Sequence, residues 1–251
     1  MSGTSLDGLD IVLVQFEENV DKIDYTIVCC EAVSYPVDLE ESIKNAHELK
    51  IDQAQVLDKA IGLFFAAQVN AFIEKNKLDQ NDIEAIAAHG QTILHQPENG
   101  FTLQLGCGST LAYHTGIPVI NDFRSLDVIA GGQGAPLVPK GDFSLFHGKA
   151  EAYINIGGFC NISFKTKNKI QAFDICPSNL PLNKYARLLN ADFDKNGEFA
   201  QAGTVNEILL RKLNELEYYS ENAPKSLGTE WLNKNFYPLI HEDLEPRTIL
   251  R

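Results

Sequence analysis

The chain has 251 residues, 44% of them hydrophobic, and a formal net charge of −13 at pH 7. This length and apolar content predict one large or two smaller domains with a sizeable core. The negative charge argues against nucleic acid and anionic membrane as partners, because both are captured by Lys and Arg that neutralise phosphates. The five cysteines show no zinc-ligand spacing. No apolar stretch approaches the ~20 residues that span a bilayer, so we expect a cytoplasmic protein with reduced thiols.

The first half of the chain alternates between strand and helix patterns. Short runs rich in Val, Ile and aromatic residues predict strands, and apolar residues at three and four residue spacing predict helices. The predicted strands are residues 9–16, residues 24–33, IEAIAAH ending at His89, FTLQL and GIPVI, and the predicted helices are roughly residues 38–50, 53–77 and 108–115. This order predicts an α/β layout with a mixed sheet.

The second half begins the same plan again. GGQGAP, residues 131–136, is too rich in glycine to form an element and predicts a connection between two units. After it come a strand, glycine turn and strand in AYINIGGFCNISF, a third strand in KIQAFDI, and helices over residues 178–190 and 204–216. No later buried strands follow before Arg251. We therefore expect a first domain at 1–135 and an incomplete second domain at 136–251.

Two glycine turns are candidates for phosphate binding. GTSLDGLD, Gly3 to Asp10, places backbone N–H groups and the Thr4 and Ser5 hydroxyls on a turn between strands, where they can face a phosphate. An ordinary hairpin turn explains the same residues by conformation alone. NIGGFCN, Asn155 to Asn161, is a second such turn, and two turns facing across a cleft can clamp a polyphosphate. No P-loop motif is present.

Three polar segments follow predicted strands, where α/β sheets collect ligands. They are HGQT from residue 89, NDFRSLD from residue 121 and FDICPSN from residue 173. His89 is as well explained by a hydrogen-bonded histidine at a strand end as by catalysis. Arg124 with Asp122 and Asp127 is compatible with a structural ion pair. Asp174, at the end of a predicted buried strand, is either a helix cap or a base.

The ordered segments GTSLDGLD, HGQTILHQP, NDFRSLDVIAGGQGAPLVP, NIGGFCNIS, AFDICPSN and PKSLGTEW resemble the anhydro-N-acetylmuramic acid kinase family of the actin, Hsp70 and sugar-kinase superfamily. The resemblance implies a duplicated ribonuclease H-like α/β fold with mixed sheets, the second domain being incomplete. It also implies a homodimer. Family enzymes use ATP and Mg²⁺ to open 1,6-anhydro-N-acetylmuramic acid with water and phosphorylate its O6, giving N-acetylmuramic acid 6-phosphate for peptidoglycan recycling.

The resemblance also assigns the site residues. The ATP-phosphate residues are Gly3, Thr4, Ser5, Leu6, Asp7, Gly8, Leu9, Asp10, Gly157 and Gly158. The sugar-binding residues are His89, Gln91, Asn121, Asp122, Arg124 and Asn179. Asp174 matches the aspartate that activates water, and the Mg²⁺ ligands are not identified. The chain departs from the family in having FDICPSN for FDTGPGN, and family members continue past Arg251 with adenosine-binding and further sugar-binding segments.

Two other functions stay open. Another kinase of the superfamily, acting on an ordinary sugar or a carboxylate, would need no water-activating base. An inactive relative could bind cell-wall sugar or a partner as a sensor, although the retained Asp174 argues against this. A cytoskeletal or chaperone-like ATPase would have no use for the NDFR and HGQT segments.

Overall fold

The computed structural model describes residues 8–19, 22–146, 149–167, 169–241 and 243–251. The chain divides into two compact units, Met1–Leu137 and Val138–Arg251. The boundary lies one residue beyond the glycine-rich segment 131–136. Helices and strands occur in both units, so the chain is of mixed α/β class. The finer assignment to ribonuclease H-like domains stays a prediction.

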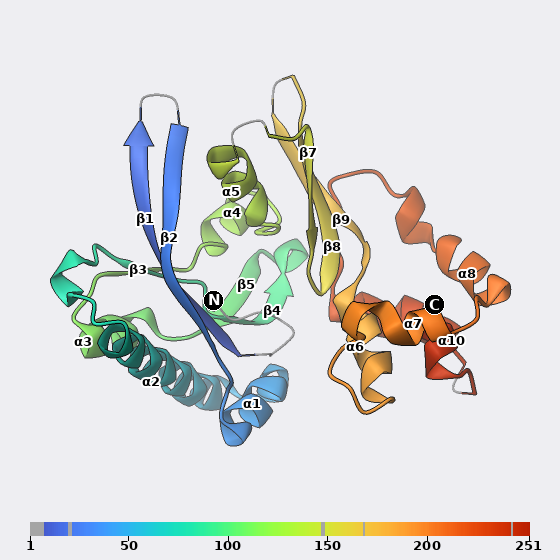
Figure 1. Cartoon of the computed structure of the whole chain (residues 1–251), viewed down its shortest axis with the longest axis horizontal. Coiled ribbons are helices and arrows are strands. Elements are labelled where there is room, and N and C mark those ends of the chain that lie inside the picture. Colours follow the sequence, from blue (N-terminus) through green and yellow to red (C-terminus); the bar gives the residue numbers. More distant parts are fainter. Residues whose placement is uncertain (1–7, 20–21, 147–148, 168, 242) are drawn as a thin grey trace. The chain divides into compact units, whose positions relative to one another are not determined.

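Unit 1 opens with the two predicted antiparallel strands, which are confirmed and form a long hairpin (Figure 1). Its strands are β1 Leu9–Asn19, β2 Lys22–Val33, β3 Ile86–Ala88, β4 Gln91–Gln96, β5 Phe101–Leu105 and β6 Val119–Asn121, and its helices are α1 Val37–Lys44, α2 Ile51–Lys75, α3 Gly108–Thr115 and α4 Ser125–Ile129. The hairpin register runs from Leu9 opposite Val33 to Asn19 opposite Lys22. Gly8 precedes it with a φ of +138°, and a Cβ there would overlap the Val33 carbonyl, so this position requires glycine.

The core of unit 1 is built around α2. Its buried face carries Ile61 and Phe65, which pack with Leu9 from β1, Leu105 from β5 and Leu111 from α3. Each such side chain contributes about 1.5–3 kcal/mol through burial. The helix begins where the Gln53 side chain accepts a hydrogen bond from the Lys50 N–H at 3.1 Å. The sequence predicted this helix because apolar residues recur at three and four residue spacing, and in the structure the residues at this spacing face the core.

By length and composition, α2 is also able to cross a membrane, so the prediction that no apolar stretch is long enough is wrong for this helix. One such helix is weak evidence, because the core helix of a soluble protein passes the same test. Four buried residues of α2 belong to the core of unit 1, namely Leu57, Ile61, Phe65 and Ala66.

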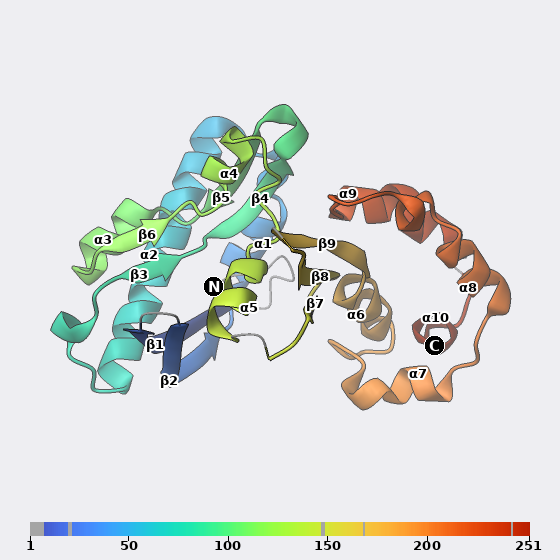
Figure 2. The ribbon, with the colours of Figure 1, turned by 90° about the horizontal axis from the view of Figure 1, so that it is seen from above.

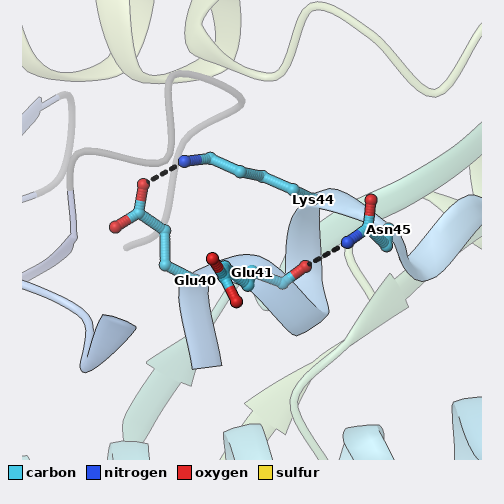
Figure 3. Close-up of polar contacts among 4 residues, drawn as sticks. All are labelled: Glu40, Glu41, Lys44 and Asn45. Carbon is cyan, nitrogen blue, oxygen red and sulfur yellow. Dashed lines mark hydrogen bonds and ion pairs between the residues drawn. The ribbon is translucent and has the colours of Figure 1, made fainter. Parts of the chain in front are cut away.

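Helix α1 is shorter than predicted because the chain changes to a single 3-10 turn at Ala46–Glu48. Figure 3 shows its last turn, in which the Lys44 ammonium pairs with the Glu40 carboxylate one turn earlier. In the same view the Asn45 side-chain amide donates to the Glu41 carbonyl at 3.1 Å (Figure 3). These contacts satisfy the end of the helix locally, and exposed pairs of this kind contribute about 0.3–0.5 kcal/mol.

The remaining strands of unit 1 form pairs. Strands β3 and β6 are parallel, with Ala88 opposite Asn121, and Figure 2 shows them side by side near α3. Strands β4 and β5 are antiparallel. In place of the predicted mixed sheet, the described residues of unit 1 form three separate two-stranded sheets. The sequence prediction missed β4, because the polar residues of HGQT hid a strand that begins directly after Gly90 turns the chain with a φ of +73°.

Unit 2 contains a three-stranded antiparallel sheet in the order β7–β8–β9, which follows helix α5 and confirms the predicted strand, turn, strand and strand (Figure 1). Its strands are β7 Ala152–Ile156, β8 Phe159–Lys165 and β9 Ile170–Pro177, and its helices are α5 Val138–Leu145, α6 Asn179–Arg187, α7 Glu198–Ala202, α8 Glu207–Asn214, α9 Thr229–Trp231 and α10 Pro246–Leu250. Helices α6 and α8 were predicted, whereas α5, α7, α9 and α10 were not. The helical core contains Tyr185, Leu209, Ile240 and Leu250.

Candidate active site

A pocket of about 500 Å³ lies in unit 1 between α2, β5 and the polar ends of β3 and β6. Three predicted sugar-binding residues line it, namely His89, Asn121 and Asp122. Its remaining polar lining includes Asp58, Gln104 and Ser109. The parallel pairing of β3 with β6 explains this convergence, because it brings the carboxyl ends of both strands to one edge.

His89 lies at the end of β3 with both ring nitrogens in hydrogen bonds. The Arg124 Nε is 2.9 Å from His89 Nε2, and His89 Nδ1 is 2.9 Å from the Gly90 carbonyl. The Gly90 carbonyl can only accept a hydrogen bond and the Arg124 guanidinium can only donate one. His89 Nδ1 therefore donates, Nε2 accepts, and the imidazole is neutral. Burial and the Arg124 charge lower the pKa of His89, which agrees with this neutral form. His89 therefore has the geometry of a fixed acceptor and not of a free acid or base.

Arg124 does not form the expected ion pair with Asp122 and Asp127. Its guanidinium instead contacts His89 and donates from Nη1 to the Gly134 carbonyl at 2.6 Å. Asp127 accepts from the Gly134 N–H at 2.7 Å. Both residues thus fix the glycine-rich segment, and the ion pair, which the sequence left open as one of two interpretations, does not form. Arg124 does not line the pocket itself, but it contacts His89, which does, and so it acts on the pocket through His89.

Asn121 and Asp122 occupy the end of β6. The Asn121 amide lies against Gly108, where a Cβ would come within 2.8 Å of its Cγ atom. Asp122 has a left-handed φ of +55°, and its Oδ1 accepts from the Ser125 N–H at 3.3 Å. Asp and Asn adopt this conformation more readily than other side chains. Gln91, the other predicted sugar-binding residue of unit 1, is buried in β4 and does not line the pocket.

Asp174 lies within β9 of unit 2 and not at a strand end, since the strand continues to Pro177. Its Oδ2 accepts from the Leu227 N–H at 2.8 Å, and no described residue donates to its other carboxylate oxygen. Helix α6 begins at Asn179 without a side-chain cap. The helix-cap interpretation of Asp174 is therefore wrong. Burial raises the pKa of Asp174, and the Leu227 N–H opposes this rise by stabilising the carboxylate.

The second glycine turn joins β7 to β8 and packs against the start of α6. The Gly157 carbonyl accepts from the Asn179 N–H at 3.0 Å, and the Gly158 carbonyl accepts from Ser178 and Leu180. No described residue accepts from the Gly158 N–H. A Cβ on Gly157 would meet only ordinary contacts, the nearest being the Phe159 carbonyl oxygen at 3.5 Å. The fold therefore does not by itself require glycine at position 157.

The predicted residues Gly3, Thr4, Ser5, Leu6 and Asp7 lie outside the described residues. Of the rest of that turn, Gly8 has the structural requirement given above, the Leu9 side chain is buried in the core, and Asp10 is exposed in β1. Within the described parts of the chain, no three His, Cys, Asp or Glu side chains gather where they could hold a metal ion.

Comparison with known proteins gives one consistent result. The family model for anhydro-N-acetylmuramic acid kinase matches residues 1–247. The chain belongs to the anhydro-N-acetylmuramic acid kinase family. It is 39% identical to the enzyme of that name from Francisella tularensis subsp. novicida, 40% identical to that of Haemophilus influenzae and 38% identical to that of Shewanella denitrificans. These alignments cover 94%, 93% and 98% of the chain but only 66%, 63% and 69% of the relatives. The chain thus spans about two thirds of the length of these anhydro-N-acetylmuramic acid kinases.

The family motif PKSLGTEW provides residues around Asp174 that sequence reasoning did not assign to the site. Besides Leu227, the Tyr218 hydroxyl donates to the Asp174 carbonyl at 2.7 Å, and the Asp174 N–H donates to the Lys225 carbonyl at 3.2 Å. The available signal in the sequence was the resemblance of PKSLGTEW, residues 224–231, to the family. Nothing in the sequence pointed to Tyr218.

Proposed function

We propose that this chain carries the water-activating half of an ATP-dependent kinase that opens 1,6-anhydro-N-acetylmuramic acid and phosphorylates its O6. The observation that carries the proposal is the Asp174 carboxylate. It is largely buried, one oxygen is fixed by the Leu227 N–H, and the other receives no hydrogen bond from a described residue. An oxygen of this kind is placed to accept a proton from water.

The base has a defined task in the reaction. Water attacking the anomeric carbon loses its proton to Asp174, and the bond from that carbon to O6 breaks. As O6 leaves it becomes the acceptor of the γ-phosphoryl group, so one carboxylate serves a coupled reaction. Burial raises the pKa of Asp174 and so makes the carboxylate a stronger base than an exposed aspartate.

ATP and Mg²⁺ would supply the phosphoryl group and neutralise its charge. Among the described residues, the turn at Gly157 and Gly158 fits a phosphate, because the Gly158 N–H has no acceptor and the contacts around Gly157 do not by themselves require glycine there. Gly3 to Asp10 complete the proposed phosphate residues. Among the residues that the structure describes, no group of side chains identifies the Mg²⁺ ligands.

The pocket in unit 1 is the proposed sugar subsite, with His89, Asn121 and Asp122 lining it and Arg124 and Gln91 supporting it. Asn179, at the start of α6, stays a proposed sugar-binding residue by resemblance alone. Asn121 and Asp122 offer the mixed hydrogen-bonding groups that hydroxyl and acetamido groups require. His89 lines the pocket with both ring nitrogens bonded to Arg124 and the Gly90 carbonyl. We further propose the duplicated ribonuclease H-like fold, a homodimer and a cytoplasmic location, on the basis of family membership.

The test is a product analysis in ¹⁸O-labelled water with ATP and the anhydro sugar, using the gene product that carries these residues. The proposal predicts ADP release and a 6-phosphate sugar with the heavy oxygen on its anomeric carbon. Turnover of a reducing sugar without ring opening would instead establish another sugar kinase of the superfamily. Sugar binding without ADP release would establish an inactive sensor.

A further inference from the structure

Asp174 is held from both edges of β9. On one edge β8 pairs with it, Asn161 standing opposite Asp174 in the register. On the other edge, the segment Pro224–Leu227 runs beside the strand. There the Asp174 N–H donates to the Lys225 carbonyl at 3.2 Å, and the Leu227 N–H donates to Asp174 Oδ2 at 2.8 Å. Main chain and carboxylate are thus fixed by one short segment.

That segment is in turn braced by a lysine and a tyrosine. Lys225 Nζ donates to the Tyr218 carbonyl at 2.7 Å and lies 4.5 Å from the centroid of the Tyr218 ring. The Tyr218 hydroxyl donates to the Asp174 carbonyl at 2.7 Å, which closes a ring of contacts through Asp174, Lys225 and Tyr218. Tyr218 is only 3% exposed and packs against Trp231 at a ring-centroid distance of 5.4 Å. The brace therefore has little freedom to move.

The Lys225 ammonium does not pair with the Asp174 carboxylate. An ammonium beside Asp174 would stabilise its charged form and weaken it as a base. The Lys225 ammonium instead contacts the Tyr218 carbonyl oxygen and the faces of the Tyr218 and Phe173 rings, the Phe173 centroid lying 5.9 Å away. The lysine can thus hold the segment in place without pairing with the carboxylate that it positions.

We propose that Lys225 and Tyr218 are positioning residues of the reaction, which hold the Leu227 N–H on one oxygen of Asp174 and so fix the direction of the other oxygen. This inference rests on the proposed function, because it gives Asp174 the role of base. It assigns a role to a lysine and a tyrosine that are not among the proposed sugar-binding or ATP-phosphate residues.

The test compares Lys225→Met, Lys225→Arg and Tyr218→Phe with matched controls. Lys225→Met keeps the aliphatic stem without the charge, and Tyr218→Phe keeps the ring without the hydroxyl. Lys212→Met and Tyr219→Phe make the same chemical changes at an exposed lysine of α8 and at the neighbouring tyrosine. Each variant is assayed for kcat, both KM values, the pH profile of kcat and thermal stability.

We expect Lys225→Met and Tyr218→Phe to lower kcat by about tenfold with KM values nearly unchanged, since a misplaced base affects the chemical step. The acidic limb of the profile should move to higher pH, because a loosened Leu227 N–H stabilises the carboxylate less and the pKa of Asp174 rises. Lys225→Arg should restore most of kcat, because a guanidinium can also donate to a carbonyl and lie on an aromatic face. The two controls should match the wild type.

The outcomes separate this inference from the proposed function. If Asp174→Asn loses activity while Lys225→Met and Tyr218→Phe keep the wild-type kcat and acidic limb, the positioning role is wrong and the base stands. If Asp174→Asn retains activity, the proposed function fails first. Should Lys225→Met be too unstable to assay, Tyr218→Phe decides alone, and an unmoved acidic limb in that variant overturns the inference.

Discussion

Gly157→Ala tests whether the β7–β8 turn exists for the fold or for a phosphate. The Cβ of alanine would lie 3.5 Å from the Phe159 carbonyl oxygen and 3.9 Å from the Asn155 side-chain nitrogen, and both are ordinary contacts. The change in the free energy of unfolding should therefore stay within about 0.5 kcal/mol. If the methyl group displaces a phosphate from the turn, one charge-assisted hydrogen bond of about 1.5–3 kcal/mol is lost. That loss corresponds to an increase of about 10- to 100-fold in the KM for ATP.

The assay is ATP-dependent ADP release beside a melting curve, with two matched glycine substitutions. Gly141→Ala lies in α5 with open space around the new Cβ, and it should leave the KM for ATP unchanged. Gly8→Ala places the Cβ against the Val33 carbonyl at a positive φ, and it should lower the melting temperature clearly. A wild-type KM for ATP in Gly157→Ala would refute the phosphate role, and a large loss of stability would show that the turn is structural.

Three further predictions concern titration, burial and reactivity. Because the pKa of His89 is lower in the folded state, its contribution to stability should be fully present above the unfolded pKa of about 6.5 and lost as pH falls through the folded pKa. The melting temperature should therefore drop as pH falls below about 6.5, and it should drop less in His89→Gln. Ser163→Ala removes the hydroxyl that donates at 2.8 Å to the buried Asp142, and denaturant unfolding should show that the free energy of unfolding falls by about 1–3 kcal/mol. A loss near zero would mean that water replaces the hydroxyl. Burial and the neighbouring Cys160 raise the pKa of Cys176, so its thiol should react more slowly than that of the exposed Cys30. Mass spectrometry after brief alkylation at neutral pH measures this, and faster modification of Cys176 would contradict it.

Much of the fold could be predicted from local pattern. Helix α2 follows from periodicity, because it buries the face that its spacing marks. The hairpin β1–β2 and the strands on either side of the second glycine turn follow from their content of Val, Ile and aromatic residues, although several of these, such as Phe16 and Ile156, are exposed. Strand β4 was missed because the polar residues after His89 concealed it. The separation into small sheets could not be predicted either, since register and pairing depend on contacts between distant segments.

The site was predicted less completely than the fold. The sequence placed His89, Asn121 and Asp122 together, because polar residues that follow parallel strands meet at one edge. It could not show that Arg124 contacts His89 in place of an aspartate, because hydrogen-bond partners follow from side-chain direction and not from spacing. It also could not show Tyr218 beside Asp174, since these residues are 44 positions apart and are joined only by tertiary packing.

The central claim is that Asp174 is the base that activates water, and Asp174→Asn tests it most directly. Asparagine keeps the size of the side chain and an oxygen able to accept from the Leu227 N–H, but it has no basicity. With the anhydro sugar and ATP, the account predicts that kcat falls by ~10² to 10⁴ while the affinity for the sugar and the melting temperature change little. A folded variant with a rate near that of the wild type would contradict it.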